Sequence, residues 1–411
     1  MAAGRGAELL RPPMSSGRAT FLELFFDLAF VVALTRVSQR FAGLADDTGW
    51  ALVTGFGRTL LLFLALWLIW SHTAWITSRY EPEQPVIQAV VIGTMFAGLI
   101  MAVTLPRALE ERAVPFAVAY LMVMVLRPLV VAVALRGHPR RLVPFRLVVW
   151  ALVSAPLWLV GALGPDHLRL PLWVVALAVD YLAWVLGWPL PWLGVSRIGR
   201  WRIAGTHLAD RYQQMFLIAL GESILVIGVV FSGADYSGDR AAAFAVTFAT
   251  SALLWRIYFY RAGLLLSEAF GRAGMPGRLG ATSERTHLFI VLGVLVTSVG
   301  YELVIDHPFG QPRPTWLLFV VGGPMLFLVA RLRLEYEVFG QVSRPQVIGL
   351  GALLVFTPAL AHRAPMVGLS VVACVLALVA LLGALRWRGQ SLEVPASPIG
   401  RETSGDRDSE A

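Results

Sequence analysis

The sequence has one cysteine, no lysine and few charged residues. Because the single thiol, Cys374, lies inside an apolar stretch, a disulfide framework and a cysteine-based metal site are both excluded. Charged residues make up 15% of the 411 residues and hydrophobic residues 57%, whereas soluble domains average about 25% and about 45–50%. With a mean hydropathy of +0.70, the composition excludes an ordinary soluble protein. It predicts an all-α polytopic transmembrane helix bundle.

The sequence also lacks the common motifs for nucleotide binding, serine hydrolysis and zinc binding. No G-x-x-x-x-G-K-[ST] or G-x-G-x-x-G element stands in a usable context, and no G-x-S-x-G marks a strand-to-helix turn. No two histidines have the spacing of H-E-x-x-H. We therefore expect no cofactor and no bound metal, and we regard histidines hydrogen-bonded in a polar vestibule as the better interpretation.

Apolar stretches of about 20 residues, long enough to cross a bilayer as helices, recur throughout residues 19–388. We expect residues 1–18 to form a cytoplasmic tail and residues 389–411 a disordered cytoplasmic tail, because both are polar. The twelve predicted spans are 21–43, 51–77, 85–105, 115–135, 145–163, 171–193, 207–231, 241–261, 287–306, 315–333, 346–362 and 366–386.

The distribution of the 34 arginines supports this topology. With both termini in the cytoplasm, 22 arginines fall in inner segments or at the inner ends of spans, 6 in outer loops and 6 deeper within spans. Such an excess on one side is the positive-inside signal of a membrane protein. The same scattering in short clusters argues against nucleic-acid binding, so the expected partners are the lipid bilayer and an unknown small solute or ion, in an unknown oligomeric state.

Acidic residues occur in the first predicted span at Glu23 and Asp27. They are one helical turn apart and Ser38 continues their face. Ionisable groups at membrane depth are expensive and are functional candidates by default. Because the two carboxylates repel each other, either a cation lies nearby or one of them is protonated. A proton or cation site and a structural ion pair both remain open.

The seventh predicted span supplies a cation. His207, Arg211 and Glu222 fall on one stripe of a helix. Arg211 and Glu222 are about 16 Å apart along the axis, so they cannot pair with each other. We predict that Arg211 is held by Asp27, Glu23 or both, since the first and seventh spans start on the same side.

Three further ionisable residues are placed near the bilayer centre: Glu222, Asp180 in the sixth span and Arg127 in the fourth. Glu222 is the predicted proton-binding residue. The structural alternative is that Arg127 permanently neutralises Glu222 or Asp180.

A polar vestibule is predicted at the cytoplasmic ends of the spans. Its candidate residues are His72, Arg79, His207, Trp255, Arg256 and His287. In the sixth span, Trp184, Trp188 and Trp192 would form an aromatic stripe at i, i+4 and i+8, although Pro189 and Pro191 interrupt the helix. A broken helix beside a pathway is one way to build a substrate site.

With these residues identified, the chain resembles the bacterial low temperature requirement A family of polytopic membrane proteins. The matching segments are Glu23–Leu28, Thr73–Trp75 with Arg79–Pro82, Arg127, His207–Arg211, Leu220–Ser223, His287 and His307–Pro308. The likeness covers roughly residues 20 to 386. In one departure, Arg256 follows Trp255 near the position where relatives carry an acidic residue. The resemblance implies a role in tolerating cold or another stress at the bacterial inner (plasma) membrane, without naming a substrate.

A fainter likeness connects Phe25-Phe26-Asp27 with the F-S-D signature of the lysosomal potassium channel family, whose members repeat a six-span unit. Twelve spans would permit a parallel six-plus-six duplication.

Three classes of function follow from these observations. The first is a proton-linked or ion-conducting permease with Glu23, Asp27 and Arg211 as an inner gate and Glu222 as the titratable centre. The second is an intramembrane enzyme acting on a lipid or isoprenoid, which would show an apolar cavity open sideways to lipid. The third is a sensor or scaffold whose polar residues only lock helices together.

Overall fold

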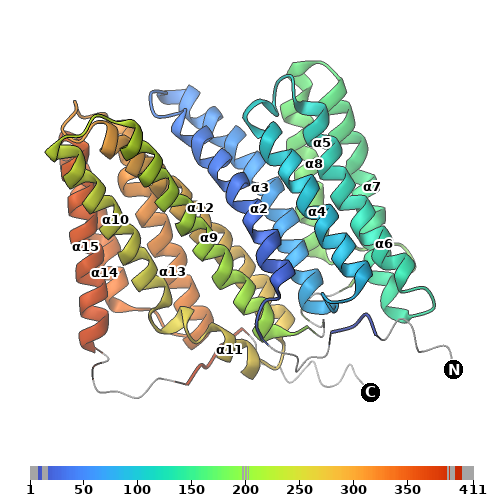
Figure 1. Ribbon diagram of the computed structural model, residues 1–411. Coiled ribbons are helices and arrows are strands. Elements are labelled where there is room, and N and C mark those ends of the chain that lie inside the picture. Colours follow the sequence, from blue (N-terminus) through green and yellow to red (C-terminus); the bar gives the residue numbers. More distant parts are fainter. Residues whose placement is uncertain are drawn as a thin grey trace. The chain divides into compact units, whose positions relative to one another are not determined.

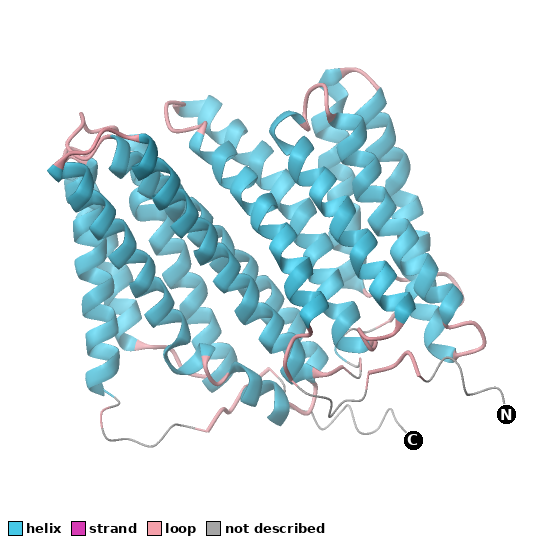
Figure 2. Cartoon of the chain, viewed as in Figure 1, coloured by secondary structure: helices cyan, strands magenta, loops and turns pink. Residues whose placement is uncertain are grey.

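The computed structural model describes residues 8–11, 17–196, 199, 201, 203–386, 388 and 394–399. These residues are helices and loops, with no strand among them (Figure 2). The all-α polytopic class is therefore confirmed.

A helix lies at each of the twelve predicted apolar stretches, and one further short helix of the described chain, Leu266–Arg272, lies outside them (Figure 1). In chain order they are α2 (Phe21–Ala42), α3 (Gly49–Arg79), α4 (Pro85–Thr104), α5–η2–α6 (Ala113–Leu121, Met122–Leu126, Arg127–Ala134), α7 (Leu142–Leu163), α8 (Asp166–Leu186), α9 (Gly205–Gly233), α10 (Gly238–Tyr258) with η5 (Phe259–Gly263), α11 (Leu266–Arg272), α12 (Pro276–Asp306), η7 (Leu318–Gly322) with α13 (Gly323–Phe339), α14 (Arg344–Leu360) and α15 (Pro365–Arg386), and short 3₁₀ turns lie at Leu105–Arg107, Pro139–Arg141 and Pro314–Trp316.

Ten of the described helices are long and apolar enough to cross a membrane. The other two predicted spans are helical but fall outside that group. α2 carries Glu23, Asp27, Arg36 and Arg40, and α14 has 17 residues. The chain is a multi-pass membrane protein; the count of twelve crossings and the side of the termini remain predictions.

The chain divides into two compact units. Unit 1 holds the chain up to Val37 and Thr54–Leu208, and unit 2 holds Ser38–Val53 and the chain from Ala209. Each unit contains a helix interrupted by a π-helical turn and then X-Pro: Met122–Leu126 before Arg127-Pro128, and Leu318–Gly322 before Gly323-Pro324. This shared irregularity in the fourth helix of each half favours the duplication hypothesis.

The sixth helix is shorter than predicted. α8 ends at Leu186 because Gly187 adopts a left-handed conformation (φ 74°), and Pro189 and Pro191 cannot continue the helix. The helix is thus interrupted where Pro189 and Pro191 lead us to expect it, and the three tryptophans do not form a continuous stripe. Trp188 lies beyond the helix and still contacts Trp184 with ring centroids 5.2 Å apart, whereas Trp192 is fully exposed.

The predicted C-terminal tail falls largely on residues outside the described part of the chain. Within it, residues 394–399 are described, and the Ala396 N–H donates to the Val338 carbonyl oxygen at the end of α13. The predicted N-terminal tail is likewise described only in part, where the Arg11 N–H donates to the Arg79 carbonyl oxygen.

Candidate functional site

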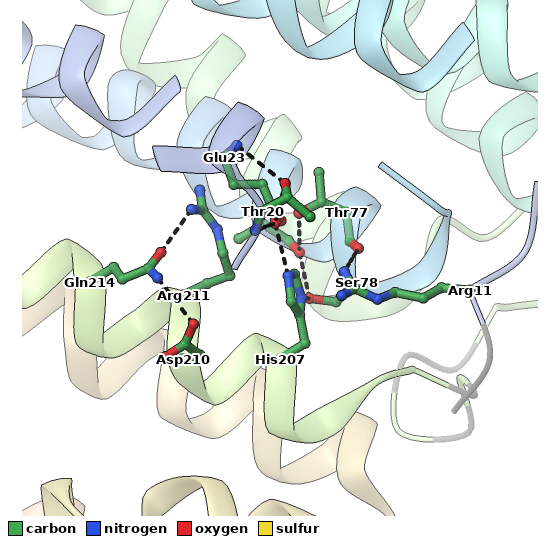
Figure 3. Close-up of polar contacts among 10 residues, drawn as sticks. Arg11, Thr20, Glu23, Thr77, Ser78, His207, Asp210, Arg211 and Gln214 are labelled. Atoms are coloured by element: carbon green, nitrogen blue, oxygen red, sulfur yellow. Dashed lines mark hydrogen bonds and ion pairs between the residues drawn. The ribbon is translucent and has the colours of Figure 1, made fainter. Parts of the chain in front are cut away.

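In unit 1, Glu23 forms a buried cluster with the beginning of α9 (Figure 3). Its Oε2 atom lies 3.0 Å from His207 Nε2 and accepts hydrogen bonds from the backbone and hydroxyl of Thr20. Thr20 and Glu23 stand in the T-x-x-E arrangement that caps a helix N-terminus reciprocally. Glu23 therefore caps α2 and contacts a buried imidazole at the same time.

The hydrogen bonds around His207 limit where its protons can be. Ser78 Oγ donates to the Ala74 carbonyl oxygen at 2.7 Å, so its single proton is used there and it accepts from His207 Nδ1 at 2.9 Å. The predicted vestibule histidine and the first-span carboxylate are thus in direct polar contact, with His207 Nε2 and Glu23 Oε2 3.0 Å apart.

Asp27, the other acidic residue of the first span, accepts a hydrogen bond from Trp70 Nε1 at 3.0 Å. The predicted pairing of Arg211 with Asp27 or Glu23 would join residues assigned to different units, and it stays a prediction. In unit 2, Arg211 Nη1 donates to Gln214 Oε1, and Gln214 donates to Asp210 (Figure 3).

Arg127 follows directly after the π-helical turn and is 3% exposed. Its guanidinium donates to the Ile69 carbonyl oxygen, to the Thr73 hydroxyl and to His72 Nδ1 at 3.2 Å. No carboxylate forms an ion pair with Arg127 among the described residues, and its Nε–H has no hydrogen-bond acceptor there. The alternative that Arg127 neutralises Glu222 or Asp180 therefore gains no ion pair in its support, and it stays a prediction.

Beside Arg127, an open groove runs between α4 and the α5–η2–α6 helix. Its walls are apolar apart from Thr94 and Arg127, and they are formed by Ala89, Val90, Gly93, Thr94, Ala97, Met122, Val123, Leu126, Arg127 and Val130.

The buried carboxyl group of Asp180 is stabilised by hydrogen bonds from neutral side chains. Its Oδ2 atom accepts from the Tyr120 hydroxyl at 2.8 Å and from Trp158 Nε1 at 3.3 Å. Trp158 in turn accepts from Trp173 through its carbonyl oxygen. These contacts tie α5, α7 and α8 together, which indicates a structural role for Asp180.

We expect Tyr120→Phe to lower the free energy of unfolding of the purified protein by about 1–3 kcal/mol, because Asp180 loses a buried donor. Chemical unfolding in detergent followed by circular dichroism measures this. Tyr236→Phe is the matched control, since Tyr236 is 84% exposed. Equal stability of both variants would contradict the structural role of this hydrogen bond.

His72 and Arg79 line a small aromatic pocket in unit 1, together with Trp75, Trp184 and Trp201. Because His72 Nδ1 accepts from Arg127, its proton is on Nε2, which has no partner among the described residues. The Arg79 guanidinium lies 4.4 Å above the Trp201 ring. These two predicted vestibule residues thus lie together at one end of α3.

Glu222 lies within α9 in unit 2 and is 0% exposed. Neither carboxyl oxygen has a hydrogen-bond partner in the described part of the chain. The nearest hydroxyls, of Ser38 and Ser298, face the carboxyl group and lie 2.8 Å from each other. A buried carboxylate without a counterion is costly, so the group either carries a proton or binds a cation.

Acidic residues continue from Glu222 along one face of α12. Ser298, Glu302 and Asp306 are spaced four residues apart. Glu302 is close enough to Glu222 for electrostatic repulsion, and Asp306 is close enough to Glu302. Glu302 is not among the site residues predicted from the sequence. Its position as an ionisable residue within the predicted ninth span would have been enough to identify it.

The other vestibule candidates in unit 2 are separate from Glu222. His287 Nε2 lies 2.8 Å from the Tyr258 hydroxyl, and its ring stacks on Tyr212 at 4.9 Å. Trp255 is 48% exposed, and Arg256 lies over the Tyr260 ring. The vestibule candidates of unit 2 thus make contacts of their own, and a vestibule shared with His72, Arg79 and His207 of unit 1 stays a prediction. No three His, Cys, Asp or Glu side chains converge as a metal site in the ranges that the structure describes.

The sequence is similar to known proteins over most of its length. A family model described as bacterial low temperature requirement A protein (LtrA) matches residues 18–381. An uncharacterized protein of Rhizobium meliloti (strain 1021) is 33% identical over 343 residues, covering 82% of this chain and 81% of the relative. The match extends from α2 to α15 and so includes both units.

Proposed function

Because this chain belongs to the bacterial low temperature requirement A family, we propose that it is a multi-pass protein of the bacterial inner membrane and a proton-linked or ion-conducting permease. Glu222 is its protonation site. The observation that carries this proposal is the complete burial of the Glu222 carboxyl group with no hydrogen bond to either oxygen in the described chain. A role in growth at low temperature is part of the proposal and is supported by the family description alone.

A route for protons supports the assignment within unit 2. Hydroxyls suited to relaying a proton surround Glu222, and Glu302 and Asp306 continue toward the end of α12. Asp306 is the last residue of that helix, so a proton entering there meets acidic or hydroxyl groups at each turn down to Glu222. Ionisable chains of this kind are typical of proton relays in membrane proteins.

Reconstitution into liposomes tests the proposal. Under a valinomycin-driven potassium potential, liposomes containing the wild-type protein should take up protons faster than protein-free liposomes, as measured with an enclosed pH-sensitive dye. Infrared difference spectra on changing pH should also show the carbonyl band of a protonated carboxylic acid. Absence of both signals from folded protein would overturn the assignment.

The second candidate, an enzyme acting on a lipid or isoprenoid, is favoured by the apolar groove beside Arg127. An enzyme would convert a lipid substrate in detergent without any membrane potential, whereas a permease would leave it unchanged. Thin-layer analysis of lipids incubated with the protein distinguishes the two.

A further inference from the structure

The groove between α4 and α5–η2–α6 combines two features that are unrelated to Glu222. It is formed within unit 1, and the buried residue Arg127 is the one charged residue among those lining it, beside apolar side chains and Thr94. We propose that this groove binds a single-chain carboxylate of the fatty-acid class, with its hydrocarbon chain along α4 and its carboxylate on Arg127.

The shape of the groove favours a chain. Ala89, Gly93 and Ala97 lie at intervals of four residues on α4, so small side chains form one wall over about 12 Å. Met122, Leu126 and Val130 form the facing wall and are 41–48% exposed. In a membrane-spanning helix, exposed apolar side chains face lipid, so a chain enters sideways without crossing a polar barrier.

The charge of Arg127 favours an anion. Its Nη atoms donate to neutral groups only, namely Ile69, Thr73, His72 and the Met124 sulfur. Its Nε–H is buried and has no acceptor among the described residues. A carboxylate would supply both the missing acceptor and the missing negative charge, and an Arg–carboxylate contact is among the strongest hydrogen bonds in proteins.

The depth of Arg127 favours a fatty acid over a phospholipid. Arg127 begins α6, which continues seven residues to Ala134, so the guanidinium side chain starts about 10 Å from that end of the helix. A phospholipid holds its phosphate at the headgroup level and would have to sink that distance. A single-chain carboxylate can move along the groove until it reaches Arg127.

Photolabelling tests the proposal on the full chain purified in detergent. A palmitic acid carrying a diazirine in its chain should label peptides that contain residues 89–97 and 122–130. Unlabelled palmitate should compete, whereas hexadecanol, which has the same chain and no charge, should not. Equal competition by hexadecanol would overturn the role of Arg127, and competition by phosphatidylglycerol instead of palmitate would overturn the fatty-acid assignment.

Two variants locate the site. A Cβ atom at Gly93 would meet no atom within 4 Å, so Gly93→Leu places a larger side chain in the groove from an open position on α4. We expect Gly93→Leu to reduce labelling by about tenfold or more, because the leucine side chain occupies the space of the hydrocarbon chain. We expect a similar reduction for Arg127→Gln, because the carboxylate loses its positively charged partner. Gly228→Leu is the matched control, since Gly228 is another exposed helical glycine with open space beside it. Unchanged labelling in Gly93→Leu would overturn the site even if Arg127→Gln fails to fold.

Discussion

Replacing Glu222 by glutamine should abolish proton uptake by proteoliposomes and leave the protein folded. Glutamine has nearly the same shape but cannot bind or release a proton, so the relay ends at this position. Glutamine keeps an oxygen that can face the Ser38 and Ser298 hydroxyls, and the buried Glu222 carboxyl group has no counterion in the described chain that the substitution would leave unpaired. We expect uptake to fall at least about tenfold, corresponding to at least about 1.4 kcal/mol in the rate-limiting barrier.

The control for this experiment is Glu111→Gln, which removes a carboxylate from the exposed turn between α4 and α5. It should transport at the wild-type rate. Glu302→Gln should slow uptake by less than Glu222→Gln, since water can replace a half-exposed relay group more easily than a buried one. Wild-type uptake in folded Glu222→Gln protein would refute Glu222 as the protonation site.

Replacing Gly323 by alanine should prevent formation of a stable unit 2. A Cβ atom at Gly323 would lie 2.6 Å from the Thr297 backbone nitrogen, because α13 begins in close contact with α12. A backbone atom cannot move away without displacing the helix. We therefore expect a loss of about 3 kcal/mol or more, at or above the upper end of ordinary overpacking, seen as aggregation in size-exclusion chromatography and a lower thermal midpoint.

The neighbouring residue is a matched control for that substitution. A Cβ atom at Gly322 would approach the nearest atom only to 3.6 Å, and that atom belongs to the Leu318 side chain. Gly322→Ala should therefore behave like the wild type. If the Gly323 variant eluted and melted like the Gly322 variant, the close approach of α12 and α13 would be wrong.

Hydropathy alone located all twelve helices of the predicted topology, because apolar stretches of membrane length have few other stable conformations. It misplaced the end of α8. The helix ends at Leu186 because Gly187 is followed by Pro189 and Pro191. The hydrophobic residues Trp188 and Trp192 nevertheless made the span look longer in the sequence. Glycine and proline set the backbone dihedral angles whatever the polarity of their neighbours.

The polar candidates were identified from the sequence, but their partners were not. The cost of an ionisable residue at membrane depth depends on the residue itself, so Glu222, Asp180 and Arg127 are recognisable from their positions in apolar stretches. Whether such a residue is compensated depends on which helices pack together. Asp180 is paired with Tyr120 and Trp158, which look like ordinary core residues in the sequence.

The sequence by itself determined the membrane class, the helices and the family of this protein, since these follow from local composition and from residue identity. Only the tertiary structure decided that Glu23 caps α2 and contacts His207, that Arg127 lines a groove and that Glu222 faces the hydroxyls of Ser38 and Ser298. These facts join residues far apart in the chain. The side-chain packing that brings them together has no periodic signature along the sequence.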